Sequence, residues 1–278
     1  MRKKTLILCL VSVLVFLIGP VQSEAGTYML GVKGWYTTWE SSVLDWFEQN
    51  LVLEFASLGR NIKASKDAGS GHLVGPLMSY QTDDGKWSAS FAAMVFSSFK
   101  QDWEGAAAGM EMDADVGLDR IDFDLAVNYS LNKYISFFVG YKYQDMDMDF
   151  TLAYTTMMGD MTNKYKLESG VHIPTAGAGF VYPVSDKIAL SAQLGLLYSI
   201  PDLIMTDNEG TRYDIWPRGG FGFNGEININ YQPTENLIIQ LGYRYQRFQM
   251  EARKPETWTK IGSDDITHGP TLSAVWVF

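Results

Sequence analysis

The chain has 278 residues, and its 22 basic and 32 acidic side chains give a formal net charge of −10. Nucleic-acid binding depends on basic clusters that contact phosphates, so no nucleic-acid partner is expected for such an acidic chain. Cys9 is the only cysteine, which excludes disulfides within the chain. Beyond residue 25, no apolar run approaches the roughly 20 residues of a membrane-spanning helix.

Residues 1–25 have the pattern of a secretory signal peptide. A basic start is followed by an apolar stretch at 6–18, and residues 23–25 form the small-x-small pattern that signal peptidase accepts. The apolar stretch is short for a membrane span, which disfavours a retained anchor helix. We therefore expect cleavage after Ala25 and a mature domain at 26–278.

The first predicted strand, at 28–39, leads into a long polar stretch at 40–72. Ser42 and the residues after it have the spacing of a capping box, and the apolar residues that follow fit a short amphipathic helix. The alternation at 51–55 fits an extended hairpin equally well. The sequence leaves both structures open for this first outer loop.

Strict alternation marks the strands that follow. In 135–144 the odd positions are all apolar or aromatic, and the even positions are mostly small or polar. Successive side chains of a strand point to opposite faces, so this strand has one continuous apolar face. The pattern recurs at 121–129 and 221–231, and 237–246 even repeats the ending GYKYQ as GYRYQ. The polar face is rich in Gly, Ser, Asn and Gln, which suits a barrel lumen.

Four short turns recur at intervals of roughly fifty residues, the length of one β-hairpin plus one long outer loop. Each turn contains residues that adopt tight-turn dihedrals readily, and each follows a tyrosine. A tyrosine at the same depth before every short turn is typical of an aromatic girdle at the inner membrane interface. The tyrosines that we assign to this girdle are Tyr80, Tyr129, Tyr182 and Tyr231.

Longer polar stretches separate the turns, at 40–72, 101–119, 153–172, 201–217 and 252–269. Short turns at one end and long loops at the other are the asymmetry of bacterial outer-membrane barrels. One strand on each side of every turn, together with a first and a last strand, gives about ten strands. The predicted fold class is therefore all-β: a transmembrane antiparallel up-and-down β-barrel of about ten strands, with short periplasmic turns and long extracellular loops.

Alternation places charged side chains on the lumen face of this barrel. Ten strands leave a narrow interior, where charges are costly unless they pair across strands. We expect Asp124 directly opposite Lys142. If Tyr231 pairs with Leu237, Glu226 lies opposite Gly242 and diagonal to Arg244. We predict a stabilising ion-pair network and keep open a selectivity constriction lined by the same groups. The predicted network consists of Asp122, Asp124, Lys142, Glu226 and Arg244.

Methionines and acidic residues cluster in the predicted outer loops. Thioethers are soft ligands that suit Cu(I), and carboxylates suit Ca²⁺ or Mg²⁺, so a metal-handling barrel is an open alternative. Alternation at 145–150 separates carboxylates from methionines, which a solvated strand extension explains without a metal. We expect no metal and no cofactor. The candidate ligands for the alternative are Met110, Met112, Met146 and Met148.

The segment 271–278 alternates Leu272, Ala274, Trp276 and Phe278. It resembles the C-terminal assembly signal of Gram-negative outer-membrane proteins, a broad class and not one functional family. The resemblance implies that the barrel-assembly machinery recognises Trp276 and Phe278. It also implies an outer-membrane location among lipids and lipopolysaccharide, and it leaves the oligomeric state open.

Some ten-stranded barrels are enzymes. The omptin protease family places Asp residues and an Asp-His pair at the outer rim, and the candidate pair here is His268 with Asp265, but no omptin motif surrounds it. The sequence therefore favours a non-enzymatic barrel with a largely packed, ion-paired lumen, either a structural or surface protein or a narrow small-solute channel. The alternative is an outer-surface hydrolase, such as an omptin-like protease or a lipid-modifying enzyme.

Overall fold

The computed structural model describes residues 26–40, 62–66, 69–107, 110–156, 159–207, 209–253 and 260–278. The predicted signal peptide at 1–25 and the first outer loop at 41–61, with its open choice between helix and hairpin, lie outside these residues. In the described ranges no helix is long and apolar enough to cross a membrane.

Thirteen strand segments make up the regular structure of the described ranges: β1 (Thr27–Glu40), β2 (Ile62–Lys66), β3 (Gly69–Gln81), β4 (Trp87–Met94), β5 (Phe96–Ala107), β6 (Met110–Ser130), β7 (Ile135–Thr156), β8 (Gly159–Pro183), β9 (Ile188–Tyr198), β10 (Ile200–Thr206), β11 (Arg212–Thr234), β12 (Leu237–Arg253) and β13 (Lys260–Val277). They form one antiparallel sheet, which closes because β1 pairs with both β13 and β3. Three barrel strands consist of two segments each: β2 with β3, β4 with β5, and β9 with β10. The described segments thus form a closed barrel of ten strands, and the predicted fold class is confirmed.

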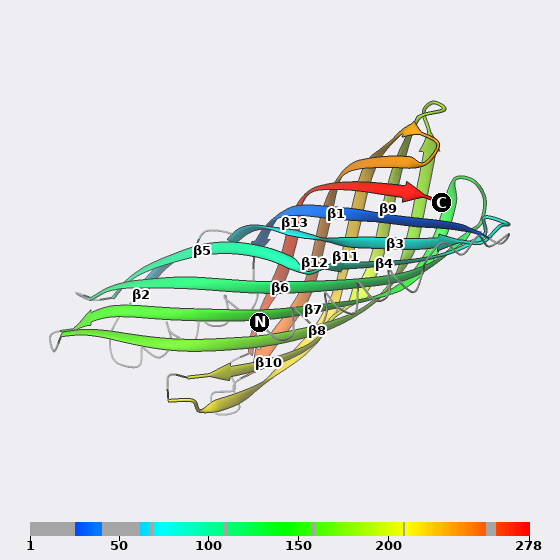
Figure 1. The fold of residues 1–278 in the computed structure, drawn as a ribbon. Coiled ribbons are helices and arrows are strands. Elements are labelled where there is room, and N and C mark those ends of the chain that lie inside the picture. Colours follow the sequence, from blue (N-terminus) through cyan, green and yellow to red (C-terminus); the bar gives the residue numbers. More distant parts are fainter. Residues whose placement is uncertain are drawn as a thin grey trace.

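The two ends of the barrel differ, as Figure 1 shows. At the end near the C-terminus, tight turns join β3 to β4, β6 to β7, β8 to β9 and β11 to β12. At the opposite end, the long β5–β6 and β7–β8 hairpins project beyond their neighbours. Much of the sequence predicted as outer loop at 101–119 and 153–172 is therefore strand. The reason is that paired alternation continues outward, with β6 and β7 in register from Ser130 opposite Ser136 to Met112 opposite Tyr154.

The outer wall of the barrel carries apolar side chains, as a lipid-facing surface requires. Leu194 and Leu196 on β9 and Ile227 on β11 are 63%, 73% and 62% exposed. Each of them is flanked along its strand by residues that point into the barrel, because side chains alternate between the two faces. The lipid side and the lumen side are therefore chemically distinct along the same strands.

Aromatic side chains lie on the outer wall at the level of the short turns. Tyr80 packs against Tyr28 of β1, with ring centroids 4.9 Å apart. Trp87, which the sequence analysis did not single out, packs in the same way against a girdle tyrosine of β6, also at 4.9 Å. Three of the four tyrosines assigned to the girdle are exposed there: Tyr129, Tyr182 and Tyr231.

Two barrel strands are interrupted where a neighbouring glycine leaves room. Between β4 and β5 the backbone N–H of Val95 donates to Val74, and a Cβ at Gly75 would lie 1.7 Å from the Ala93 oxygen. Between β9 and β10 the interruption is at Ser199, and a Cβ at Gly219 would lie 1.6 Å from the Ser199 oxygen. Such irregularities bend a strand locally, and only glycine permits these close backbone approaches.

The β11–β12 hairpin differs from the expected register. Tyr231 pairs with Ile239 and not with Leu237, because the strand is irregular between Tyr231 and Thr234 and the turn lies two residues further on. Pro233, which has no backbone N–H, falls within this irregular stretch. The expectation that Glu226 lies opposite Gly242 was therefore wrong: its direct partner across the strands is Arg244.

Candidate functional site: the barrel lumen

Inward-facing side chains of β6, β7 and β12 form a polar layer across the lumen, defined here as Arg120, Asp122, Asp124, Lys142, Gln144, Arg244 and Gln246. At its outer edge Arg120 donates two hydrogen bonds to Asp122, from Nε to Oδ1 at 2.8 Å and from Nη2 to Oδ2 at 2.9 Å. Both side chains are almost completely buried. Two parallel bonds to a carboxylate are the strongest geometry that a guanidinium offers.

Lys142 connects this pair to the opposite wall. The register places Lys142 directly across from Asp124, as expected, but the shorter ion pair is with Asp122 at 3.0 Å, against 3.9 Å for Asp124. Lys142 Nζ also donates to Gln246 Oε1 at 2.9 Å, and Gln246 in turn donates to Gln144. β7 and β12 are separated by β8, β9 and β11 in the barrel, so these bonds cross the lumen.

Arg244 of β12 joins two strands that lie furthest apart around the barrel. Its Nη1 donates to Asp124 Oδ2 at 3.0 Å, and β12 and β6 lie on opposite sides of the ten-stranded ring. Trp35 of β1 is buried beside this layer, with Arg244, Lys142 and Arg120 at 5.0, 5.5 and 6.0 Å from its ring centroid. Cations at these distances are attracted by an indole face, and more strongly where water is excluded.

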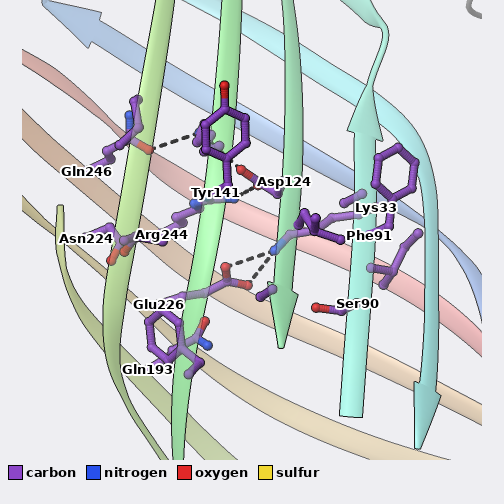
Figure 2. A pocket seen from close by; sticks show the side chains of 18 of the residues that line it. Lys33, Ser90, Phe91, Asp124, Tyr141, Gln193, Asn224, Glu226, Arg244 and Gln246 are labelled. Carbon is purple, nitrogen blue, oxygen red and sulfur yellow. Dashed lines mark hydrogen bonds and ion pairs between the residues drawn. The ribbon is translucent and has the colours of Figure 1, made fainter. Parts of the chain in front are cut away.

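Glu226 has a different partner from the one predicted. Its carboxylate accepts two bonds from Lys33 of β1, at 2.7 and 2.9 Å, while Arg244 turns to Asp124 (Figure 2). Glu226 and Arg244 lie opposite each other in the sheet and interact electrostatically, but each forms its direct ion pair with another residue. Both candidate partners are inward-facing cations, and strand pairing alone does not determine which of them a long side chain reaches.

An apolar plug lies on the outer side of the polar layer. Along β7, Met146 and Met148 follow Gln144 outward, and along β12, Phe248 and Met250 follow Gln246. All four belong to one buried cluster to which most strands of the barrel contribute. The other large members include Trp35, Trp39, Leu73, Phe99, Leu118, Leu167 and Leu203. The outer half of the lumen is thus filled by packed side chains.

A cavity of about 340 Å³ occupies the lumen on the inner side of the polar layer. Lys33, Glu226 and Arg244 line its charged part (Figure 2). The remaining lining mixes two further charged residues, Asp124 and Lys142, with serine and amide side chains such as Ser79, Gln193 and Asn224 and with apolar side chains such as Leu77 and Phe138. The cavity is large enough and polar enough to admit water, whereas packed apolar side chains fill the lumen on the outer side of the polar layer.

The candidate catalytic pair is not brought together. Asp265 points inward and accepts a hydrogen bond from Trp39 Nε1 at 3.2 Å, while His268 lies on the outer wall beside Tyr243 and Tyr245. Three residues separate the two on β13, which puts their side chains on opposite faces of the sheet. The pair cannot share a proton in this arrangement.

The methionines considered as metal ligands divide into two groups. Met146 and Met148 are fully buried in the apolar plug, where their thioethers fill space between apolar side chains. Met110 and Met112 lie on β6, and their side chains are outside the described part of the structure. Trp276 and Phe278 are exposed on the outer wall, 49% and 72% respectively, and their role in assembly stays a prediction.

Several lumen residues escaped the sequence analysis. Arg120 shares a face with Asp122 by the same alternation, and extending the β6 pattern outward by one residue would have found it. Lys33 and Trp35 alternate on β1 in the same way. That strand was recognised, but its inward positions were not assigned. The signal was present in both cases.

These features together define a class. A closed ten-stranded barrel with an apolar outer wall, an aromatic girdle, short turns at one end and long hairpins at the other is an outer-membrane β-barrel of a Gram-negative bacterium. No protein-family model matches the chain, and no curated protein matches it.

Three solved structures that match this chain are distant from it in sequence. The Escherichia coli outer-membrane protease OmpT is 12% identical, with 91% of this chain and 96% of that chain covered and a TM-score of 0.47. The translocator domain of the Neisseria meningitidis autotransporter NalP is 9% identical, with 99% and 96% covered and a TM-score of 0.45. The Pseudomonas aeruginosa outer-membrane protein OprG is 11% identical, with 91% and 96% covered and a TM-score of 0.31.

Proposed function

We propose that this protein is a closed, non-enzymatic outer-membrane barrel that serves as a structural or surface protein. The observation that carries the proposal is the filling of the outer half of the lumen. Ion pairs link opposite walls through Asp124–Arg244 and Lys142–Asp122, and the apolar plug covers them on the outer side.

Charge balance supports a structural role for the polar layer. The three cations of the layer face the carboxylates of Asp122 and Asp124. A third carboxylate, that of Asp265, interacts electrostatically with Arg120. A selectivity constriction needs an excess of one sign facing a wet path. Here the charges are matched, and the Arg120–Asp122 pair is buried, which is the arrangement of a structural network.

A narrow channel is the second function that the lumen suggests, because the inner cavity is polar and about 340 Å³ in volume. Permeation would require that cavity to continue outward past Trp35, Met146 and Phe248, each of which is at most 1% exposed. An enzymatic function has less support, since the candidate pair His268 and Asp265 lies on opposite faces of β13.

Planar-bilayer conductance of the refolded, full-length mature protein tests the proposal. We expect no steady conductance in molar potassium chloride, although folded protein is present in the bilayer. Insertion is verified in parallel by protease protection in vesicles of the same lipid. Stable, reproducible conductance steps from the unmodified protein would overturn the closed-barrel proposal and favour the channel.

A further inference from the structure

The chain has three histidines, and all three lie on the outer wall at one depth. Eight residues separate each histidine from an aromatic residue of the inner girdle region on its own strand: His72 from Tyr80, His172 from Phe180, and His268 from Trp276. Eight residues span about 26 Å along a strand, or about 20 Å across the membrane at the usual tilt. This places the histidines at the opposite, outer edge of the apolar band, which is about 25 Å tall.

Each histidine also faces a tyrosine on the neighbouring strand. His72 pairs with Tyr36, His172 with Tyr143, and His268 with Tyr245 in the register of the sheet. The inner edge of the band, by contrast, contains no histidine, because the chain has only these three. Both edges carry tyrosine hydroxyls, but only the outer edge adds imidazole nitrogens.

A hydrogen bond orients the imidazole of His268. Nδ1 lies 2.7 Å from the hydroxyl of Tyr243, and the ring stacks on Tyr245 at an interplanar angle of 18°. With the tyrosine O–H donating to Nδ1, the neutral ring carries its proton on Nε2. The same contact joins Tyr141 to His172, so the arrangement occurs twice. In this tautomer, Nε2–H is the imidazole donor that remains for a group outside the protein in both places.

The surroundings of the two copies differ in charge. Above Tyr245 on the same face lies Arg247, whose guanidinium pairs with Asp264 through one Nη and keeps further N–H donors. His172 instead has Asp145 and Asp202 near its partner Tyr143, and both carboxylates act electrostatically on that tyrosine. Beside His268 an anion meets guanidinium N–H donors of Arg247, whose charge Asp264 balances, whereas beside His172 it meets two carboxylates.

We propose that the outer-wall surface formed by Tyr243, Tyr245, Arg247 and His268 binds the phosphate group of an outer-leaflet lipid headgroup. His268 Nε2–H and the free guanidinium N–H groups of Arg247 donate to the phosphate oxygens. The tyrosine rings lie at the boundary between headgroups and acyl chains, where amphipathic aromatic residues are favoured. The geometrically similar His172 surface serves as a natural comparison without the cation.

The test uses full-length mature protein in a phosphate-free maltoside detergent with a chelator present, so that divalent cations cannot bridge lipids to carboxylates. Bisphosphorylated lipid A and chemically dephosphorylated lipid A are each titrated, and the rise in unfolding temperature gives an apparent affinity. We expect the phosphorylated lipid to bind more tightly by about tenfold or more, because the dephosphorylated lipid cannot accept the charge-assisted hydrogen bonds.

Matched substitutions locate the site. His268→Phe keeps an interfacial ring and should lower the affinity for phosphorylated lipid A by about tenfold, equivalent to about 1.4 kcal/mol. His172→Phe should change this affinity by less than about twofold. His268→Gln, which retains an N–H donor, should recover most of the affinity. Such a recovery would show that the loss in His268→Phe comes from the missing donor and not from misfolding. Equal binding of the two lipids, or equal effects of the two Phe variants, would refute the proposal.

Discussion

The lumen charges differ in how much water reaches them. The carboxylate of Asp122 is 1% exposed and holds two cations, Arg120 and Lys142. The carboxylate of Glu226 is 16% exposed, lines the inner cavity and forms its ion pair with Lys33. An unpaired charge is costly only where water cannot replace the lost partner, so these two sites should respond differently to the same change.

The substitutions Asp122→Asn and Glu226→Gln test this difference. Asp122→Asn removes the closest carboxylate of two buried cations and should lower the free energy of unfolding by about 3–5 kcal/mol. Glu226→Gln leaves a lysine that cavity water can solvate and should cost about 1 kcal/mol or less. Urea unfolding in lipid vesicles, followed by tryptophan fluorescence, measures both. Similar losses for the two variants would show that the outer half of the lumen is as wet as the inner half.

Alternation identified the inward-facing charges correctly but not all of their partners. Asp124 lies opposite Lys142 because both positions follow from one hairpin with a short turn. The Asp124–Arg244 and Lys33–Glu226 pairs join strands that are far apart in the ring. Those contacts depend on the barrel's diameter and on side-chain reach, which a single sequence does not specify.

At the scale of strands, the interruptions at Val95 and Ser199 depend on glycine in the adjacent strand. A Cβ at Gly219 would collide with the Ser199 backbone oxygen, whereas Gly117 on β6 has nothing within 4 Å of that position. Gly219→Ala should therefore destabilise the barrel by about 1–3 kcal/mol, the usual cost of overpacking. Gly117→Ala is the matched control and should be close to neutral. Unfolding measurements that give the same loss for both would mean that the backbone near Ser199 adjusts freely.

The turn between β3 and β4 gives a prediction for pH. The Thr82 hydroxyl donates to Asp84 at 2.6 Å, and this bond, with one from the Lys86 backbone, holds the pKa of Asp84 below its usual value of 3.8. A lowered folded-state pKa stabilises the fold above the unfolded value, and that stability is lost as pH falls through the folded value. The difference in unfolding free energy between the unmodified protein and Asp84→Asn should therefore shrink below about pH 4. A difference that stays constant from pH 6 to pH 2 would contradict this.

The sequence predicted where the strands lie more accurately than where they end. The four short turns and the alternating strands beside them were identifiable because the lipid face imposes a period of two. The outward extensions of β5 to β8 were taken for loops. Outside the membrane both faces of a strand are free to be polar, so the alternation of apolar and polar residues that marks a strand disappears. The irregular stretch between Tyr231 and Thr234 shifted the β11–β12 register by two residues, and one extra irregularity is enough to misassign every pair beyond it.

For the whole molecule, the proposed closure of the lumen rests on two layers stacked along the barrel axis. The polar layer ties opposite walls together, and the apolar plug covers its outer side, while the Asp124–Arg244 pair borders the inner cavity. Each layer supports the other, because the ion pairs would weaken in contact with water and the plug side chains need a floor to pack against. Trp35 belongs to both layers, since its ring contacts the plug and faces the three cations.

Removing the Trp35 indole should therefore open the barrel to ions. Trp35→Ala deletes a side chain that is 1% exposed, leaves a gap between Arg244 and the plug, and should cost about 3–5 kcal/mol of stability. We expect this variant to show conductance in planar bilayers with weak preference between cations and anions, because the charges around the gap are balanced. Trp35→Phe fills most of the space and should stay closed. If Trp35→Ala inserts and folds yet conducts no more than Trp35→Phe, the closure resides in side chains other than Trp35.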